Sequence, residues 1–518
     1  MLHHGGGMAR LTAILMGVLL SVAPARAAEA HPFEMPESLT PAVGFWVRVY
    51  AEWHTYQVAI HDSAHPDVIY RVLDLSEFAP RPSDDWPLKN EKADRYTEQV
   101  KAAREEIAEA LRELDVTRPE SARGLGGLQR EVFLAWEHRS DDPERFGAAA
   151  GRVRSQRGLQ DRFANGWRQG GRFLGAIQQA LREAGMPEGL VAMAFTESLL
   201  DVHARSASGA VGPWQFLSGT GREYLVINDV VDERKDPVLA TMAAARYLSA
   251  AKGRLGSWGL TVTSYNYGAN GMARARAQLG TTDIERVLRE YQTRSFGFAA
   301  KNYYAEFLAS LHVITHADHY FPNTRPLPPW TFDAVALPTS ATVRDLLDQG
   351  ITRDRLAELN PALTPNALAG KVRLPRGLTV RVPVGKGAAV VQALKARGEA
   401  DPPAVASKKV KLRRGETLLA VARRHKVSLG DLCALNGLNP NDSVHAGLEL
   451  SVPAPRAGFT PLPEARAATQ HGTPVAVTFA APASLAPHAP LLAARRPAPE
   501  PVWIAFDASS SGSTPVAL

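Results

Sequence analysis

LVAMAFTESLL, residues 190–200, is an apolar segment with a single carboxylate, Glu197. The segment is predicted to be helical, and seven residues at 3.6 per turn bring Glu197 back to the sector that Leu190 occupies. Burial disfavours the charged form of a carboxylate and raises its pKa, as a general acid working near neutral pH requires. The segment therefore predicts a candidate catalytic acid on a buried helix. For a lone buried glutamate, the alternative is an ion pair with an arginine at a domain contact.

Aromatic and amide side chains follow this helix in two short blocks. Residues 212–216 have the sequence GPWQF, and residues 265–268 have the sequence YNYG. A sugar-binding groove needs such side chains, because the CH-rich faces of pyranose rings pack on aromatic rings while amides bond N-acetyl and hydroxyl groups. A saccharide groove beside Glu197 is therefore expected.

Five blocks in order along the chain resemble the lytic transglycosylase domain of the membrane-bound murein transglycosylase D type. They are residues 193–215, 232–237, 243–248, 265–268 and 299–308. The resemblance covers about residues 165–315, and less specifically the helical region that precedes them. It implies a mainly α, lysozyme-like catalytic domain with a helical N-terminal leader.

The resemblance assigns roles to individual residues. It implies that Glu197 is the catalytic acid and base. It also implies substrate-binding roles for Ser198, Gly212, Trp214, Gln215, Tyr265, Asn266 and Tyr303. The chain departs from the family pattern at Pro213, where leucine or another apolar residue is usual, and at Ala299 and Ala300, which replace Glu-Thr. These departures leave open a catalytically silent scaffold that only binds peptidoglycan.

The family's mechanism needs one carboxylate. The glutamate protonates the oxygen of the MurNAc–GlcNAc β-1,4 bond and then takes the proton of the muramic 6-hydroxyl, which attacks C1 and leaves a 1,6-anhydro end. Ordinary glycosidases instead use two carboxylates, about 5 Å or 6.5–9.5 Å apart. Asp201 is the only obvious second carboxylate here, and its position favours a helix-end or loop anchor. A lysozyme-like hydrolase, in which water is the nucleophile, stays open as an alternative.

Two later segments share a strand, helix, helix, strand layout. Residues 335–384 and 409–454 each contain a final apolar segment closed by Val-Pro, which indicates an internal duplication. Residues 410–418, VKLRRGETL, resemble a LysM module, a βααβ fold that binds N-acetylglucosamine chains. The resemblance implies glycan binding by Gly415, Glu416, Thr417, Leu418 and Asn436. The first copy lacks the Gly-Glu-Thr turn and is expected to be a degenerate module that acts as a spacer.

The N-terminal segment is typical of an export signal. Arg10 precedes the apolar residues 11–22, and residues 25–27, ARA, form a small-x-small cleavage site. The apolar segment is shorter than the roughly 20 residues of a spanning helix. The single cysteine, Cys433, lies far downstream, so no lipoprotein cysteine follows the signal. We expect residues 1–28 to be a signal peptide and the protein to be periplasmic or cell-wall associated; a retained N-terminal anchor is the alternative.

Periodicity and composition divide the rest of the chain. The expected segments are a helical N-terminal region (29–164), the catalytic domain (165–320), a linker (321–334), the two modules, a flexible connector between them (385–408) and a disordered tail (455–518). The elements expected up to the catalytic helix are a hairpin (56–60 and 68–73) and helices over 89–115, 125–136 and 143–184.

The composition excludes several other classes of protein. Lys and Arg number 59 against 53 Asp and Glu, and this small excess is spread along the chain, so nucleic acid binding has no support. One cysteine excludes an intrachain disulfide, and no zinc spacing, EF-hand, P-loop or Rossmann motif implies a metal or cofactor. His312, His316 and His319 share one helix face, but without a metalloprotease motif they favour a core or solvated face. The implied partner is the glycan strand of peptidoglycan, which leaves room for an association with other cell-wall enzymes.

Overall fold

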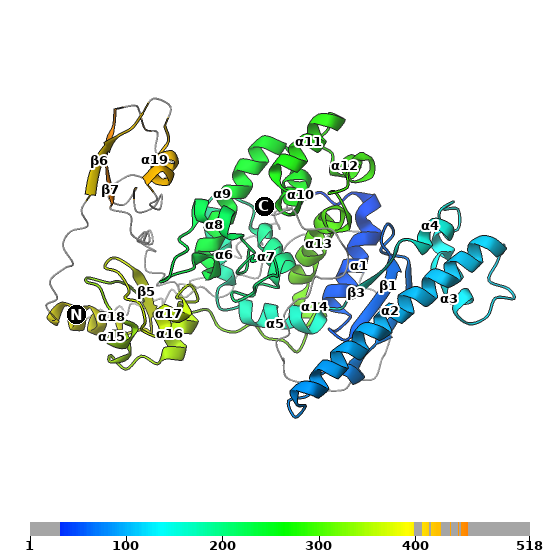
Figure 1. The fold of residues 1–518 in the computed structure, drawn as a ribbon, viewed down its shortest axis with the longest axis horizontal. Coiled ribbons are helices and arrows are strands. Elements are labelled where there is room, and N and C mark those ends of the chain that lie inside the picture. Colours follow the sequence, from blue (N-terminus) through cyan, green and yellow to red (C-terminus); the bar gives the residue numbers. More distant parts are fainter. Residues whose placement is uncertain are drawn as a thin grey trace, which may run out of the picture.

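The computed structural model describes residues 32–397, 407–413, 416–425 and 447–453, and the single positions 432, 436 and 444. Helices dominate it. Figure 1 shows a central helical domain between a mixed N-terminal part and the first C-terminal repeat. The predicted signal peptide and tail lie outside the described residues. Among the residues described, no helix is both long and apolar enough to cross a bilayer.

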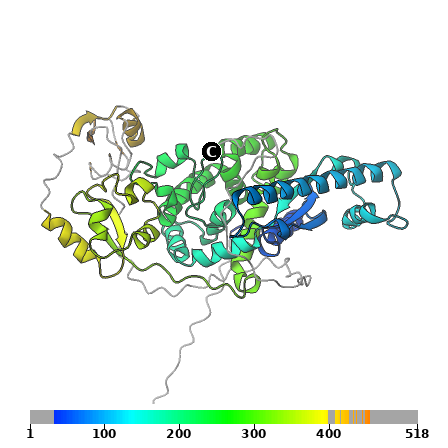
Figure 2. The same cartoon turned by 60° about the horizontal axis from the view of Figure 1, so that its bottom comes forward.

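The N-terminal part combines one long helix with a small sheet. Its elements are α1 (Thr40–Ala51), β1 (Gln57–Asp62), β2 (Ile69–Asp74), α2 (Trp86–Thr117), α3 (Gly127–Ala135), α4 (Gly147–Ala150) and β3 (Val153–Arg157). Strand β1 lies in the middle and pairs antiparallel with β2 and β3. Figures 1 and 2 show α2 lying along this sheet and extending past it. The predicted hairpin and the helices predicted over 89–115 and 125–136 are confirmed.

Strand β3 contradicts part of the prediction. Residues 143–184 are predicted to be helical, but Val153–Arg157 form a strand that pairs with β1. Strand formation depends on the neighbouring strand and on the packing of the sheet face, and here Val153 packs into the core beneath α2. The partner strand lies some ninety residues earlier, since His61 is opposite Arg154, so no local pattern reveals it. The N-terminal region therefore combines helices with a three-stranded antiparallel sheet, of which the sequence predicted only the hairpin.

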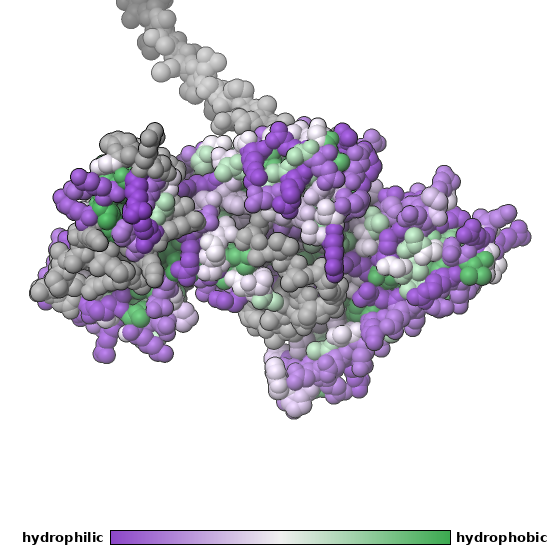
Figure 3. Space-filling view, turned by 45° about the horizontal axis from the view of Figure 1, so that its top comes forward, coloured by the Kyte–Doolittle hydropathy of each residue, from purple (hydrophilic) through white to green (hydrophobic). Residues whose placement is uncertain are grey.

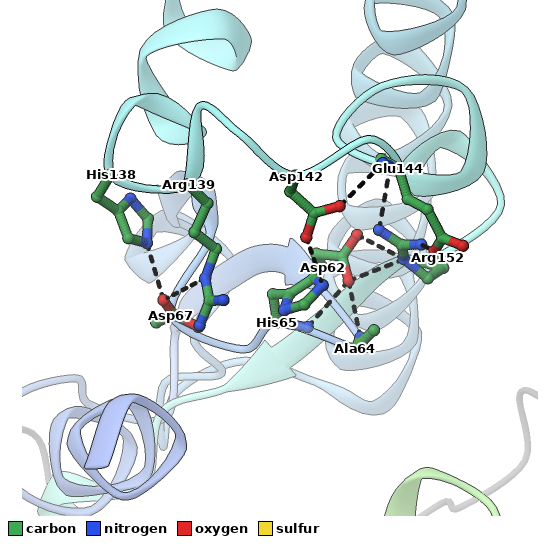
Figure 4. A network of polar contacts seen from close by, with 9 residues as sticks. All are labelled: Asp62, Ala64, His65, Asp67, His138, Arg139, Asp142, Glu144 and Arg152. Carbon is green, nitrogen blue, oxygen red and sulfur yellow. Dashed lines mark hydrogen bonds and ion pairs between the residues drawn. The ribbon is translucent and has the colours of Figure 1, made fainter. Parts of the chain in front are cut away.

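A buried carboxylate ties the sheet to the connection between α3 and α4 (Figure 4). Asp62, at the end of β1, has no exposed surface. It accepts hydrogen bonds from the amides of Ala64 and His65 at 2.7 and 3.0 Å and pairs with Arg152 at 2.9 Å. Arg152 also pairs with Glu144 at 2.8 Å. A buried charge is tolerated only with such partners, so this network holds the N-terminal part together.

The central domain is built around α7. Its helices are α5 (Gln160–Gly170), α6 (Leu174–Glu183), α7 (Val191–Ser198), α8 (Ser218–Tyr224), α9 (Pro237–Leu255), α10 (Trp258–Tyr267), α11 (Ala269–Leu279), α12 (Ile284–Glu290), α13 (Phe298–Thr315) and α14 (Ala317–Tyr320). Short 3-10 helices occur in the N-terminal part and in the central domain: η1 (Glu37–Leu39), η2 (Ser76–Phe78), η3 (Glu137–Arg139), η4 (Glu188–Leu190) and η5 (Glu233–Lys235). Helix α13 packs on α7, α10 and α1, and α1 contributes to the same hydrophobic core. The predicted mainly α domain is confirmed, and α1 belongs to its core.

The first repeat has the predicted order of elements and two more helices, α17 and α18. It comprises β4 (Asp333–Ala336), α15 (Val343–Leu347), α16 (Arg353–Leu359), the one-turn helix α17 (Pro365–Leu368), β5 (Thr379–Val382) and α18 (Gly387–Ala396). Strands β4 and β5 are antiparallel. Helix α18 lies in the segment 385–408 that is predicted to be a flexible connector, and its Val390 and Leu394 are buried in the core of the repeat. That prediction is wrong up to residue 397, and residues 398–406 lie outside the described part.

The second repeat shows the same framework where it is described. Strands β6 (Ser407–Lys411) and β7 (Glu449–Pro453) are antiparallel, and α19 (Leu418–His425) packs on them. In both repeats an asparagine joins the end of a helix to the last strand: Asn360 bonds the carbonyl of Leu356 and the backbone of Arg381, at 2.7–2.8 Å. Asn436 makes the equivalent bonds to Leu432 and Ser451 at 2.6–2.8 Å. Both repeats share this asparagine latch, as an internal duplication predicts. The latch engages the Asn436 side chain, whose predicted glycan contact stays a prediction.

The surface is mostly polar. Figure 3 shows hydrophobic residues on the visible face as small separate areas among hydrophilic ones. Among the described residues, the exposed large apolar side chains are Trp86, Leu88, Val116, Leu134, Met242 and Val384. Scattered apolar residues of this kind are ordinary for a folded protein.

Candidate active site

Helix α7 places Glu197 at the edge of the hydrophobic core. Residues 191–195 have no exposed surface, so the helix is buried along its first turns. It ends at Ser198 because Leu199 and Leu200 adopt left-handed backbone angles, with φ of 55° and 61°. Two successive left-handed leucines are costly and occur where surrounding packing imposes them. The last turn of α7 therefore presents Glu197 at a fixed position.

Glu197 has a pKa at which both its protonated and its ionised form are populated near neutral pH. Tyr303, from α13, donates a short hydrogen bond to its Oε1. Burial raises the pKa of Glu197 to about 7, and the Tyr303 hydrogen bond opposes this rise by stabilising the carboxylate. The side chain keeps some accessible surface. A group with these properties can donate a proton near neutral pH and take one back, which is the behaviour predicted from its place on an apolar helix.

The segment 209–216 forms a tight loop beside Glu197. Ser198 donates a hydrogen bond to the carbonyl of Pro213 at 3.0 Å, so the loop is tied to the end of α7. Gly212 has φ +82°, and a Cβ there would lie 1.8 Å from the carbonyl oxygen of Arg234. Only glycine fits, and the loop packs directly on the segment that contains Arg234.

Trp214 and Tyr265 support this loop from within. The indole of Trp214 has no exposed surface and donates to Thr241 Oγ1 on α9 at 2.8 Å. The hydroxyl of Tyr265, which is 4% exposed, donates to the carbonyl of Trp214 at 2.8 Å. The sequence predicted that Trp214 lines the groove and that Tyr265 flanks the scissile bond, whereas the structure buries both rings. Sequence reasoning missed this role because the partner on α9 cannot be inferred from the local sequence.

Gln215 and Asn266 carry the two side-chain amides that the sequence predicts to bind substrate. Gln215 has φ +48°, and its Nε2 donates to the carbonyl of Gly212 at 2.8 Å, which holds the side chain against the loop. Asn266 is exposed at the end of α10, and its side-chain amide makes no hydrogen bond to another described residue. The structure thus brings Tyr303 and the loop that contains Gln215 to the end of α7 that carries Glu197. Their contacts with substrate stay predictions.

Comparison with known proteins finds two domains in the chain. Residues 176–288 match the family model of the transglycosylase SLT domain, and residues 410–453 match that of the LysM domain. The chain contains an SLT domain and a LysM domain. The loop, Glu197 and Asn266 lie within the SLT match, while Tyr303 lies beyond it. The first repeat lies outside the LysM match.

Similar proteins extend the likeness beyond these domains. The chain is 26% identical over 272 residues to membrane-bound lytic murein transglycosylase D of Escherichia coli strain K12, and equally to that of strain O6:H1. Each match covers 51% of this chain and 59% of the relative, so the chain spans about three fifths of the length of these curated relatives. A crystal structure of an inactive variant of lytic transglycosylase Slt from Pseudomonas aeruginosa is 17% identical, with a TM-score of 0.26. The match covers 40% of this chain and 32% of the Slt chain, and its TM-score is too low for a comparison of folds.

A second carboxyl group lies close to Glu197. Glu306 is one turn beyond Tyr303 on α13, and burial together with the charge of Glu197 raises its pKa to about 8. Next to it, Thr196 donates to Ser310 Oγ at 3.0 Å. Sequence reasoning missed Glu306. The available signal was the polar series Tyr303, Glu306 and Ser310, which recurs at helical spacing along the otherwise apolar α13.

Asp201 and His312, both considered as candidate functional residues from the sequence, have structural roles. Asp201 accepts a hydrogen bond from the amide of His203 at 2.8 Å, so it anchors the loop after α7 as expected. His312 is buried, its Nε2 lies 3.1 Å from the hydroxyl of Tyr320, and burial lowers its pKa to about 4. Within the described parts of the chain, no group of three or more metal-ligating side chains could hold a metal ion.

The LysM residues form the turn before α19. Glu416 pairs with Arg424 at 3.1 Å, and Thr417 Oγ1 caps α19 by accepting from the amide of Ala420 at 3.1 Å. Leu418 is 2% exposed and belongs to the core of the domain. Gly415 lies outside the described residues. These bonds stabilise the turn, and its predicted contact with glycan stays a prediction.

Proposed function

We propose that the protein is a peptidoglycan lytic transglycosylase that cleaves the MurNAc–GlcNAc β-1,4 bond and leaves 1,6-anhydro-MurNAc ends. The observation that carries this proposal is Glu197: a buried carboxyl group with a pKa of about 7, hydrogen-bonded to Tyr303, beside a fixed loop. The SLT match and the likeness to lytic murein transglycosylase D support it.

The reaction needs one group that gives and then takes a proton. Protonated Glu197 donates its proton to the glycosidic oxygen as the bond between that oxygen and muramic C1 breaks. The carboxylate that remains is stabilised by the Tyr303 hydroxyl, which already donates to it. It then takes the proton of the muramic 6-hydroxyl while O6 forms a bond to C1. Glu197 ends protonated, and no water is consumed.

The second carboxyl group fits this scheme without acting as a nucleophile. With a pKa of about 8, Glu306 holds its proton near neutral pH, and a neutral carboxylic acid is a poor nucleophile. A retaining glycosidase, in contrast, needs an ionised second carboxylate about 5–5.5 Å from the acid. Asp201, the other candidate, is engaged in a loop bond. The site therefore favours an internal nucleophile supplied by the substrate.

A location at the cell wall follows from the roles that we propose for the remaining parts of the chain. We propose that the LysM domain holds the enzyme on N-acetylglucosamine-containing strands and that residues 1–28 direct export, so that the protein acts in the periplasm or on the wall. Peptidoglycan is then both substrate and anchor, and no metal or cofactor takes part. Tethering of this kind raises the local concentration of substrate at the SLT domain.

The direct test is Glu197→Gln. The amide keeps the shape of the side chain but cannot transfer the proton, so release of soluble fragments from purified peptidoglycan should fall by about 10²–10⁴-fold or more. Binding to insoluble peptidoglycan and the thermal unfolding midpoint should persist, as measured by pelleting and by circular dichroism. Activity within a few-fold of wild type would remove Glu197 from the mechanism. A wild-type protein that binds peptidoglycan but releases nothing would be a scaffold.

A further inference from the structure

The first repeat is joined to the SLT domain by backbone pairing. Val231 and Leu363 form an antiparallel bridge between the two. The amide of Asp232 donates to the carbonyl of Ala362 at 2.8 Å, and the amide of Thr364 donates to the carbonyl of the residue before Val231 at 3.0 Å. Val231 is buried in the core of the repeat. A segment of the SLT domain therefore acts as an additional strand-like edge of the repeat.

A buried ion pair strengthens this contact. Arg381, on β5, donates to Asp236 Oδ2 at 2.5 Å, and the two side chains are only 12% and 4% exposed. The other carboxylate oxygen of Asp236 caps α9 by accepting from the amides of Val238 and Leu239, both at 3.0 Å. Charged groups buried to this degree depend on one another, because removing one leaves the other without its partner.

The segment held in this way supports the active-site loop. The guanidinium of Arg234 binds both oxygens of Asp232 at 2.9 and 2.8 Å and donates to the carbonyl of Phe216 at 3.1 Å. It also lies 3.3 Å from the carbonyl of Gly209, so one side chain contacts both ends of the loop. The carbonyl of Arg234 is the group against which Gly212 packs. Residues 232–236 thus lie between the repeat on one side and the loop on the other.

The docked residues of the first repeat correspond in sequence to residues 437–443 of the LysM domain, which lie outside the described part of the structure. Asn360 and Asn436 make the same latch, so the residues that follow them are equivalent in the two repeats. In the LysM domain this is one of the two loops predicted to contact glycan. In the first repeat, residues 362–364 are covered by the SLT domain. The first repeat is therefore built into the catalytic unit, and is neither a spacer nor a free module.

We propose that Arg381 is a positioning residue of the active site. Through its pair with Asp236 it anchors residues 232–236, and through Arg234 these fix the loop that contains Trp214 and Gln215. The kinetic consequence rests on the proposed transglycosylase function, whereas the ordering of the loop does not. Arg381 lies on a different repeat from the catalytic helix and contacts no group of the groove itself.

The test compares three variants of the full chain. Arg381→Met removes the charge but keeps an aliphatic side chain, and Asp236→Asn removes the charge but keeps an oxygen that can cap α9. Arg172→Met is the control, because Arg172 pairs with Glu358 of the same repeat at 3.2 Å, at a partly exposed position that does not touch residues 232–236. Hydrogen–deuterium exchange then reports on loop order without reference to activity.

We expect the amides of residues 209–216 to exchange at least about 10-fold faster in Arg381→Met and Asp236→Asn than in wild type, while those of α13 do not change. On short soluble glycans, kcat should fall about 10-fold or more with KM within about 3-fold, because misplacing a positioned group acts on the reacting complex. Arg381→Lys should recover part of kcat, and the double variant should be no slower than either single one. Arg172→Met should resemble wild type in both measurements.

Unchanged exchange of residues 209–216 in both variants would overturn the proposal, even if their unfolding midpoints fall. Equal acceleration throughout the SLT domain would also overturn it, since that describes general destabilisation. If wild type cleaves no glycan, the proposed function fails, and the exchange data alone decide whether Arg381 orders the loop.

Discussion

Two carboxyl groups share the interior of the active site, and their surroundings differ. Glu197 accepts a hydrogen bond from Tyr303, and its pKa is about 7. For Glu306 burial is the main cause of a pKa of about 8, and the charge of Glu197 adds to it. Near neutral pH, Glu306 therefore keeps its proton while Glu197 can release and regain one. This difference assigns the acid and base steps to a single residue.

Replacing Glu306 by glutamine should stabilise the protein at neutral pH. The pKa of Glu306 is raised from 4.5 to about 8, so between these values the folded protein holds a proton that the unfolded chain has released. The free energy of unfolding therefore decreases as the pH rises through this window. An amide carries no such penalty, and Glu306→Gln should gain on the order of 1–3 kcal/mol at pH 7 and little at pH 4.

Thermal unfolding at the two pH values measures this effect. Glu105→Gln, on the exposed face of α2, is the matched control and should change neither midpoint. A Glu306 variant with the wild-type midpoint at pH 7 would show that Glu306 is not protonated in the fold.

For single residues, the sequence could predict that Glu197 is a buried acid but not which distant residues contact it. The apolar residues that bury Glu197 are its neighbours in α7, so the spacing of residues 190–200 contains the information. Glu306 and the burial of Trp214 depend on contacts with α13 and α9, which lie far along the chain. Such contacts are set by tertiary packing and leave only a weak local pattern.

The loop of residues 209–216 is the element that gives the groove its shape. It contains two left-handed glycines with almost equal angles: Gly209 with φ +83° and Gly212 with φ +82°. A Cβ at Gly209 would have no atom within 4 Å, whereas one at Gly212 would collide with the backbone of Arg234. Alanine substitutions at the two glycines therefore separate the free-energy cost of the left-handed backbone angle from the cost of the collision with Arg234.

Gly212→Ala should displace the loop and lower kcat/KM on soluble glycans at least about 10-fold, because the groups beside Glu197 move. Gly209→Ala should cost only the left-handed conformation, about 1–2 kcal/mol of stability, with kcat/KM close to wild type. Steady-state kinetics and thermal unfolding of both variants measure the two effects. Equal kinetics for the two variants would mean that packing on Arg234 does not shape the site.

Elements were predictable from sequence where their stabilising contacts are local. The long helix α2 shows the helical repeat in Ala103, Ile107, Leu111 and Leu114, which are all buried. Strand β3 depends on pairing with the distant β1, and it was missed. Helix α18 was also missed, because its Ala- and Gly-rich composition resembles a linker and only Val390 and Leu394 tie it to the repeat.

The whole molecule combines the SLT domain and the repeat docked on it with a LysM domain. The first repeat, including α18, is docked on the SLT domain, whereas the LysM domain follows residues 398–406. The end of the catalytic unit therefore lies near residue 397 and not at residue 384, where the sequence placed the end of the repeat.

Two deletions distinguish these boundaries. Removing residues 398–518 should weaken adherence to insoluble peptidoglycan, with turnover of short soluble glycans within about 2-fold of wild type, because tethering does not alter the groove. Removing residues 385–518 also deletes Val390 and Leu394 and should destabilise the repeat by roughly 2–5 kcal/mol for each large apolar side chain lost. Pelleting assays, kinetics and thermal unfolding compare the two. Identical stability of the two proteins would contradict the assignment of α18 to the catalytic unit.

The central claim is that the muramic 6-hydroxyl, and not water, attacks C1. Digestion of purified peptidoglycan in ¹⁸O-water followed by mass spectrometry of the fragments tests it most directly. The predicted fragments carry no ¹⁸O at the muramic end and are lighter than hydrolytic fragments by one water, about 18 Da in ordinary water and about 20 Da in ¹⁸O-water, because O6 closes the ring. Incorporation of one ¹⁸O at a reducing muramic end would show that water is the nucleophile and would contradict the claim.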